Sequence, residues 1–274
     1  MGKFDNILLC TDLDDTLLTT DKKVSAENQK AIEYFQTEGG IFTFATGRMP
    51  HGARLALDFV TPNAPIVCYN GAGIFDLNKN NMIWKTSLDK DSIEVVEMVE
   101  KEFNFAGIEI CGEDNVYFSR MNRIVYEHKA IERFPDNFVD YHDVTEPWIK
   151  VLFMQEKEEV AQLREFIAGS HFADKYEFIQ SSPYYYELLP KNATKGNAAL
   201  QLADILRIPH ERVIGVGDNE NDLSLVKQAG VGIAVSNAVN AIKDVADYIT
   251  VDNNSHAISA VISALANGII SIND

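Results

Sequence analysis

The sequence has 274 residues, room for one large domain or two modest ones, and 46% of them are hydrophobic and 24% charged, as in folded soluble proteins. Its 24 Lys and Arg against 41 Asp and Glu give a formal net charge of −17, which opposes binding to nucleic-acid backbones and anionic membrane surfaces. These values exclude a disordered, collagen-like or low-complexity chain.

The spacing of the cysteines and the composition of the first residues predict the cellular compartment. Cys10, Cys68 and Cys111 are widely spaced, form no Cys-x-x-Cys pair and are expected to be reduced. No stretch approaches the ~18 apolar residues of a membrane span, and the first residues lack the apolar segment of a signal peptide. We therefore expect a cytoplasmic protein.

Short apolar runs alternate with helical patterns at both ends of the chain. In chain order, the N-terminal part predicts a strand at 7–10, a helix that Ser25 caps and Gly39-Gly40 ends, a strand at 41–45, a helix at about 50–59 and a strand at 66–69. The C-terminal part predicts a helix at about 196–206, a strand at 213–216, a helix to about 229, strands at 231–234 and 248–251 around a helix near 241–246, and a helix at 257–265. This alternation favours a parallel sheet with helices on both faces and ligands at the carboxyl ends of the strands.

The middle of the chain has a different pattern. Strand candidates rich in Tyr and Phe lie at 116–118, 149–154 and 184–189, around helices near 91–103 and 158–167. We therefore expect a core formed by residues 1–84 and 191–274, and a separate inserted α+β domain formed by residues 85–190.

Four carboxylates are expected at one edge of the parallel sheet. Asp12 and Asp14 follow the first strand, and Asp218 and Asp222 follow the strand at 213–216. Two carboxylates about 4 Å apart repel by roughly 4 kcal/mol at an effective dielectric of 20, so the cluster needs raised pKa values or a cation. Mg²⁺ prefers such oxygen ligands, and waters and a substrate phosphate would complete its shell. Taken singly, however, such residues also form turns and cap helices, Asp222 most plainly.

A phosphate site at this edge also needs a nucleophile and cationic help. No Ser lies in a Gly-x-Ser-x-Gly turn and no Cys has a base at motif spacing, which leaves a carboxylate. Asp12 would attack phosphorus, and Asp14 would protonate the leaving oxygen and then activate water. The Thr46 hydroxyl, the backbone N–H groups around Leu13 and the Lys195 ammonium would bind the phosphoryl oxygens. A lone lysine is, alternatively, an exposed surface charge.

Several short motifs in order resemble those of the haloacid dehalogenase (HAD) superfamily, and more narrowly the Cof-like phosphatases with a type IIB cap. They are Asp12 to Leu18 (DLDDTLL), Ala45 to Arg48 (ATGR), Asn70-Gly71, Lys195-Gly196 and Gly217 to Asp222 (GDNEND). The resemblance covers nearly the whole chain. It implies a Rossmann-like parallel-sheet core, an α+β cap inserted between the second and third motifs, and Mg²⁺-dependent hydrolysis of phosphate monoesters.

The resemblance also implies a role for each matched residue. Asp12 would be the nucleophile and a metal ligand, and Asp14 would be the acid and base, with its carbonyl on the metal. Asp218 would be a metal ligand, and Thr46 and Lys195 would hold the phosphoryl group. Arg48, Asn70 and Gly71 would contact substrate or phosphate, and Asn221 and Asp222 would complete the site, Asp222 as a further metal ligand. Two positions depart from the family pattern. Asp15 stands where Gly is usual, so the first loop is expected to be slightly altered. Asn192-Ala193-Thr194 stand where a Gly-Val pair is common.

The sequence thus predicts an α/β, HAD-like phosphatase that uses Mg²⁺ and acts on a small phosphorylated metabolite, such as a sugar phosphate, with no nucleic-acid or membrane partner. It holds no feature that indicates an oligomeric state. A phosphomutase or phosphotransferase is an alternative, because an aspartyl-phosphate can pass its phosphoryl group to a sugar hydroxyl. A non-catalytic sensor of a phosphorylated ligand is another. A dinucleotide-binding oxidoreductase is disfavoured, because no Gly-x-Gly-x-x-Gly follows a predicted strand.

Overall fold

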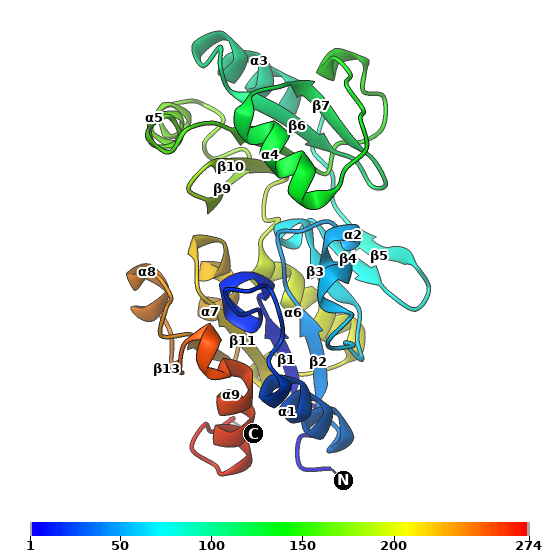
Figure 1. Cartoon of the computed structure of the whole chain (residues 1–274), viewed down its shortest axis with the longest axis vertical. Helices are drawn as coiled ribbons and strands as arrows, with labels where there is room; N and C mark the ends of the chain where they lie inside the picture. Colours follow the sequence, from blue (N-terminus) through cyan, green and yellow to red (C-terminus); the bar gives the residue numbers. More distant parts are fainter. Residues whose placement is uncertain (1, 273–274) are drawn as a thin grey trace. The chain divides into compact units, whose positions relative to one another are not determined.

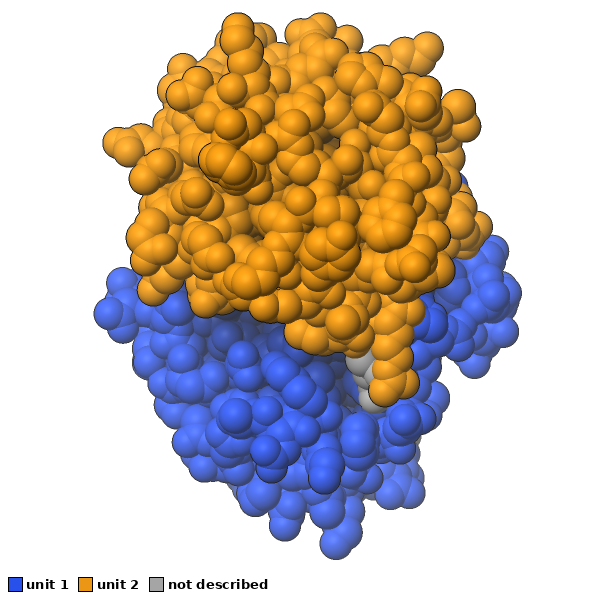
Figure 2. Space-filling model, turned by 45° about the horizontal axis from the view of Figure 1, so that its top comes forward, with its two compact units in different colours: residues 1–85, 194–274 blue, residues 86–193 orange. Residues whose placement is uncertain are grey.

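The computed structural model describes residues 2–272, which form two compact units (Figure 1). Unit 1 consists of Met1–Lys85 and Thr194–Asp274, and unit 2 consists of Thr86–Ala193; Figure 2 colours them differently. Unit 2 is therefore inserted between two halves of unit 1 in the chain. Among the described helices, none is both long and apolar enough to cross a membrane.

A five-stranded parallel sheet forms the centre of unit 1. In spatial order its strands are β13 (Tyr248–Ile249), β12 (Val231–Ala234), β11 (Val213–Gly217), β1 (Leu8–Thr11) and β2 (Ile41–Phe44). Every residue of β1 and β11 is buried, as expected for short apolar strands with helices on both faces. The parallel sheet that the strand and helix alternation predicted is confirmed, and β1 and β11 lie side by side at its centre.

The helices of unit 1 include two closely packed pairs that cover this sheet. The helices are α1 (Ala26–Thr37), α2 (Pro50–Ala53), α6 (Lys195–Leu206), α7 (Leu223–Gln228), α8 (Asn240–Lys243) and α9 (Ala257–Ala266). Helix α1 packs against α9 in front of the sheet in Figure 1, and α6 packs against α7. The predicted cap of α1 is present, since the Ser25 side chain accepts a hydrogen bond from the Asn28 N–H at 3.3 Å. The expected helix at 50–59 is wrong in length: α2 gives way to a 3-10 turn at Arg54–Ala56, after the weak helix former Gly52.

The expected third strand does not extend the parallel sheet. Strand β3 (Ile66–Cys68) pairs antiparallel with β4 (Gly73–Asp76), which pairs with β5 (Asn81–Lys85), and a single parallel bridge from Ala45 to Val67 connects this small sheet to the segment after β2. The cause is local. Asn70 at φ 53° and Gly71 at φ 100° form a tight turn that sends the chain directly back.

Unit 2 is an antiparallel sheet with helices. The strand order is β7 (Val116–Arg120), β6 (Gly107–Cys111), β8 (Lys150–Met154), β10 (Tyr185–Leu189) and β9 (Glu177–Ser182), and the helices are α3 (Ser92–Glu102), α4 (Arg123–Glu132) and α5 (Lys157–Ala168). Residues such as Val95, Phe153 and Leu163 form its own core. The sequence predicted β7, β8, β10, α3 and α5 but missed β6, β9 and α4. One-turn 3-10 helices at Tyr69–Gly71, Tyr141–Asp143, His210–Arg212, Glu220–Asp222 and Asn253–Ser255 complete the two units.

Candidate active site

Asp12 follows directly on the central strand β1, at its carboxyl end. Its backbone N–H donates to the Val216 carbonyl of β11 at 2.9 Å, which extends the parallel ladder by one residue and fixes the position of the side chain. The residue is only 6% exposed. A carboxylate held this far from water needs partners of opposite charge or with hydrogen-bond donors.

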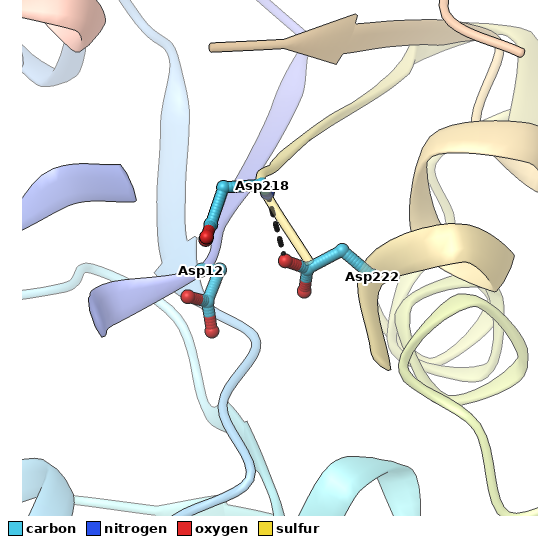
Figure 3. Close-up of side chains that lie close together, drawn as sticks. All are labelled: Asp12, Asp218 and Asp222. Atoms are coloured by element: carbon cyan, nitrogen blue, oxygen red, sulfur yellow. Dashed lines mark hydrogen bonds between the residues drawn. The ribbon is translucent and has the colours of Figure 1, made fainter. Parts of the chain in front are cut away.

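The turn after β11 brings two further carboxylates to Asp12. Asp222 Oδ2 accepts the backbone N–H groups of Asp218 at 2.9 Å and Asn219 at 3.2 Å, which closes the turn on itself. Carboxylate oxygens of Asp12, Asp218 and Asp222 all lie within 4.8 Å of one another. Figure 3 shows the three side chains converging at this edge of the sheet.

Lys195 is the cation of this cluster. Its Nζ lies 2.5 Å from Asp12 Oδ1 and 2.5 Å from Asp222 Oδ1, and the residue has no exposed surface. It begins helix α6, which Thr194 caps through the Asn197 N–H. The alternative of an exposed surface lysine is therefore wrong.

The pKa values reflect a site with more buried acid than base. Burial raises the pKa of Asp12, and the positive charge of Lys195 opposes that rise. Burial, followed by the charge of Asp222, raises the pKa of Asp218 to about 7. Desolvation lowers the pKa of Lys195, but the charges of Asp12 and Asp222 outweigh it, so the net shift is upward. A divalent cation would favour the ionised forms of Asp12 and Asp218, opposing the effects of burial and of the neighbouring carboxylates that raise their pKa values.

Asp14 lies at the same strand end as Asp12 and its charge acts on Asp12, but its carboxylate is paired with cations and is not part of the cluster of Asp12, Asp218 and Asp222. Arg48 binds it with Nε at 2.8 Å from Oδ2 and Nη2 at 3.1 Å from Oδ1, and Lys22 Nζ lies 3.1 Å from Oδ1. Burial raises the pKa of Asp14, but the hydrogen bond and charge of Arg48, with Lys22, lower it to about 2 overall. Sequence reasoning did not select Lys22, because its contact with Asp14 depends on how the turn before it folds.

The loop after Asp12 explains part of this divergence. Asp15 has φ 58°, a left-handed conformation, at the position where glycine is usual in the family that the motifs resemble. The Leu13 carbonyl accepts the Leu18 N–H at 2.8 Å and closes the loop. Thr16, which sequence reasoning did not select, donates its hydroxyl to Asp218 Oδ1 at 2.8 Å. The loop therefore turns the Asp14 side chain toward Arg48 and the Thr16 side chain toward Asp218.

The remaining expected residues follow β2 and β3. Thr46 is buried, its hydroxyl accepts the Arg48 N–H at 3.1 Å, and its carbonyl accepts the Asn70 N–H at 3.0 Å. Asn70 Oδ1 accepts the side-chain N–H of Asn221 at 3.2 Å, which connects the turn after β3 to the turn after β11. At Gly71, a Cβ would lie 2.1 Å from the Thr194 carbonyl oxygen, next to Lys195. These contacts unite the Thr46, Asn70 and Asn221 segments in one network.

The fold and these contacts can be compared with known proteins. A family model described as haloacid dehalogenase-like hydrolase matches residues 9–262. The chain belongs to this family. It is therefore a hydrolase of the HAD superfamily, as the motifs in the sequence implied, and the expected α/β fold is confirmed.

Two relatives and a solved structure extend the comparison. YxeH of Bacillus subtilis (strain 168) is 28% identical over 272 residues, covering 94% of this chain and 97% of YxeH. YcsE of the same organism, a 5-amino-6-(5-phospho-D-ribitylamino)uracil phosphatase, is 27% identical over 255 residues, covering 93% of this chain and 94% of YcsE. The structure of the HAD subclass IIB sugar phosphatase BT4131 has a TM-score of 0.81 at 19% identity, over 96% of this chain and 100% of that one, so it is similar in fold.

Proposed function

We propose that this HAD hydrolase removes the phosphoryl group from a small phosphate monoester through an aspartyl-phosphate on Asp12. One observation carries the proposal: a buried carboxylate at the end of β1 lies 2.5 Å from the buried Lys195 ammonium and within 4.8 Å of two other acid side chains. A carboxylate that could act as nucleophile and a cation that could attract a phosphate thus lie side by side, and the remaining negative charge suits a divalent metal ion.

In the proposed reaction, an Asp12 oxygen attacks phosphorus and the bond from phosphorus to the ester oxygen breaks. Lys195 favours the ionised form of Asp12 that the attack requires, because its charge opposes the upward effect of burial on the Asp12 pKa. Asp14 gives its proton to the leaving oxygen, then takes one from the water that hydrolyses the aspartyl-phosphate. Backbone N–H groups around Leu13 and the Thr46 hydroxyl would bind the phosphoryl oxygens.

Arg48 has to leave Asp14 before that carboxyl can act as an acid, because a group with a pKa of about 2 holds no proton near neutral pH. A phosphate dianion offers the guanidinium a competing bidentate partner. We therefore propose that Arg48, with Asn70, Gly71 and Asn221 nearby, binds the substrate and in doing so releases Asp14.

The residues of the site fit Mg²⁺. Three carboxylates within 4.8 Å of one another, two of them with raised pKa values, concentrate negative charge that a hard divalent cation would offset. Asp12, Asp218 and the Asp14 carbonyl would hold the ion, which would offset negative charge on the carboxylates and the phosphoryl oxygens. Both oxygens of Asp222 are engaged, one by Lys195 and one by two backbone N–H groups, so its proposed part is to hold Lys195 and the turn close to the ion.

The proposed substrate is a phosphorylated sugar or polyol in the cytoplasm. The names of two similar proteins support this class, since YcsE acts on a phosphoribityl compound and BT4131 is a sugar phosphatase. Unit 1 would then be the catalytic core, and unit 2 the inserted cap that sets substrate choice.

The test is release of inorganic phosphate from p-nitrophenyl phosphate and from a panel of sugar phosphates, with Mg²⁺ and with excess EDTA. Asp12→Asn keeps the shape and removes the nucleophile, and Asp21→Asn, an exposed carboxylate outside the site, is the matched control. We expect Asp12→Asn to lose at least 10³-fold in kcat and Asp21→Asn to match wild type. Activity that survives Asp12→Asn contradicts the proposal. Loss of substrate without phosphate release identifies a mutase or phosphotransferase, and binding without turnover identifies a sensor.

A further inference from the structure

Residues 235–239, between β12 and α8, contact both loops that carry the acid residues of the site. The Val239 N–H donates to the Asp218 carbonyl at 2.9 Å, and the Val235 N–H donates to the Gly217 carbonyl at 3.3 Å. From the same segment, the Asn237 side-chain N–H donates to the Asp15 carbonyl at 2.8 Å. One short segment therefore binds the loop after β11 through its backbone and the loop after β1 through one side chain.

Asn253 completes the connection from the other side. Its backbone N–H donates to Asn237 Oδ1 at 3.0 Å, which holds the Asn237 amide with its N–H toward Asp15. Its own side chain is buried and donates to the Leu18 carbonyl at 3.0 Å, at the far end of the same loop. The two asparagines thus bind the loop at residues 15 and 18, and we refer to Asn237 and Asn253 as the asparagine clamp.

The clamp acts on the strained residue of the loop. Asp15 is left-handed at φ 58°, which is unfavourable for a residue with a Cβ. A hydrogen bond to the Asp15 carbonyl fixes the peptide plane between residues 15 and 16. That plane sets the direction of Thr16, whose hydroxyl binds Asp218 Oδ1 at 2.8 Å. Asn237 thus acts on Asp218 through Asp15 and Thr16.

We propose that Asn237 and Asn253 are positioning residues of this hydrolase. They hold the loop that follows Asp12 in the conformation that keeps Asp14 and Thr16 directed to their separate partners. Their hydrogen bonds offset the steric cost of the left-handed conformation at Asp15, a cost that glycine would not have at that position. Neither residue touches the reacting atoms. The inference rests on the proposed function for its kinetic consequence, but the contacts themselves are independent of it.

The conformation of Asp15 allows a specific test. Asn237→Ala removes two hydrogen bonds, the one it donates to the Asp15 carbonyl and the one its Oδ1 accepts from the Asn253 N–H. The contact that acts on the loop is the first, a hydrogen bond to a neutral carbonyl near the surface, worth about 1 kcal/mol, or about fivefold in rate if the loop must be ordered to react. Because glycine adopts positive φ without a steric penalty, Asp15→Gly in the same chain is expected to restore most of the loss. An effect of Asn237→Ala on overall packing alone would not be reversed by a glycine at another site.

The experiment compares wild type, Asn237→Ala, Asp15→Gly and the double variant, with Asn254→Ala as control. Asn254 belongs to the same C-terminal region and binds Thr20, outside the clamped loop. It also donates to Asn253 Oδ1 at 3.3 Å, but the contacts of Asn253 with Leu18 and Asn237 run through its side-chain and backbone N–H groups instead. With p-nitrophenyl phosphate and Mg²⁺, we expect kcat to fall about fivefold in Asn237→Ala with KM within twofold of wild type. The double variant is expected to recover to within about twofold, and both Asp15→Gly and Asn254→Ala to stay near wild type.

Amide hydrogen exchange over residues 12–20 gives a readout that needs no activity. Asn237→Ala is expected to accelerate exchange of this loop about fivefold, and Asn254→Ala to leave it unchanged at residues 13–18. If wild type proves inactive on every phosphate ester, the proposed function fails and the exchange result alone decides on the clamp. Two results would overturn the proposal: Asn237→Ala has the same kcat and the same exchange rates as wild type, or it loses kcat and Asp15→Gly does not restore it.

Discussion

Removal of the Lys195 ammonium tests the electrostatic account of the site most directly. Lys195→Met keeps the length of the side chain and leaves Asp12 and Asp222, both buried, without the cation that lies 2.5 Å from each. Breaking a buried ion pair by removing one partner destabilises by about 3–5 kcal/mol, because the remaining charge is desolvated and unpaired. We expect the free energy of unfolding of unit 1 to fall by about that amount at pH 7.

The sign of the pH dependence follows from Asp12. Burial raises its pKa and Lys195 lowers it, so the variant has a still higher Asp12 pKa than wild type. A carboxyl group whose folded pKa exceeds its unfolded pKa contributes stability that is present at low pH and is lost as the pH rises through the folded value. The difference in the free energy of unfolding between wild type and Lys195→Met is therefore expected to shrink when the pH is lowered from 7 to 5.

Urea unfolding, followed by tryptophan fluorescence, measures the free energy of unfolding of unit 1 alone. The chain has two tryptophans, Trp84 in unit 1 and Trp148 in unit 2, so a Trp148→Phe background leaves a reporter only in unit 1. Lys23→Met, an exposed lysine of unit 1, is the control and is expected to change stability by less than about 0.5 kcal/mol. All samples contain EDTA. A deficit for Lys195→Met below about 1 kcal/mol at pH 7, or one that grows toward pH 5, would refute the reasoning.

Three further predictions concern metal affinity, the acid residue and a turn. Because burial and then Asp222 raise the pKa of Asp218 to about 7, and a metal binds the ionised form, calorimetry should show Mg²⁺ affinity rising about tenfold from pH 6 to pH 8. Arg48→Met should move the Asp14 carboxyl titration upward from about 2 in ¹³C NMR, assigned with Asp14→Asn; an unchanged midpoint contradicts the assigned cause. Gly71→Ala places a Cβ 2.1 Å from a carbonyl oxygen and should destabilise by roughly 3 kcal/mol or more in thermal unfolding, against about 1 kcal/mol for Gly268→Ala, which has positive φ but no atom within 4 Å.

Much of the fold could be predicted because its signals are local. Strands β1 and β2 are short apolar runs that end in polar residues, and Ser25 caps α1 through a residue three positions away. Carboxyl ends of neighbouring parallel strands lie together, so Asp12 and the turn after β11 could be assigned to one edge before any contact was known. The local rules failed where a turn reversed the chain, as at Asn70 and Gly71, which made β3 part of an antiparallel sheet.

By itself, the sequence determined the family, the α/β class and the residue types that meet at the end of β1. Only the tertiary structure decided which of them pair. Lys195 reaches Asp12 across 183 positions, Thr16 reaches Asp218 across 202, and Asn237 reaches Asp15 across 222. Asp14, two residues from Asp12, turns instead to Arg48. The physical reason is that such pairings depend on single backbone angles, here the positive φ of Asp15, and on side chains from distant segments that balance buried charge. Neither of these leaves a periodic signal in the sequence.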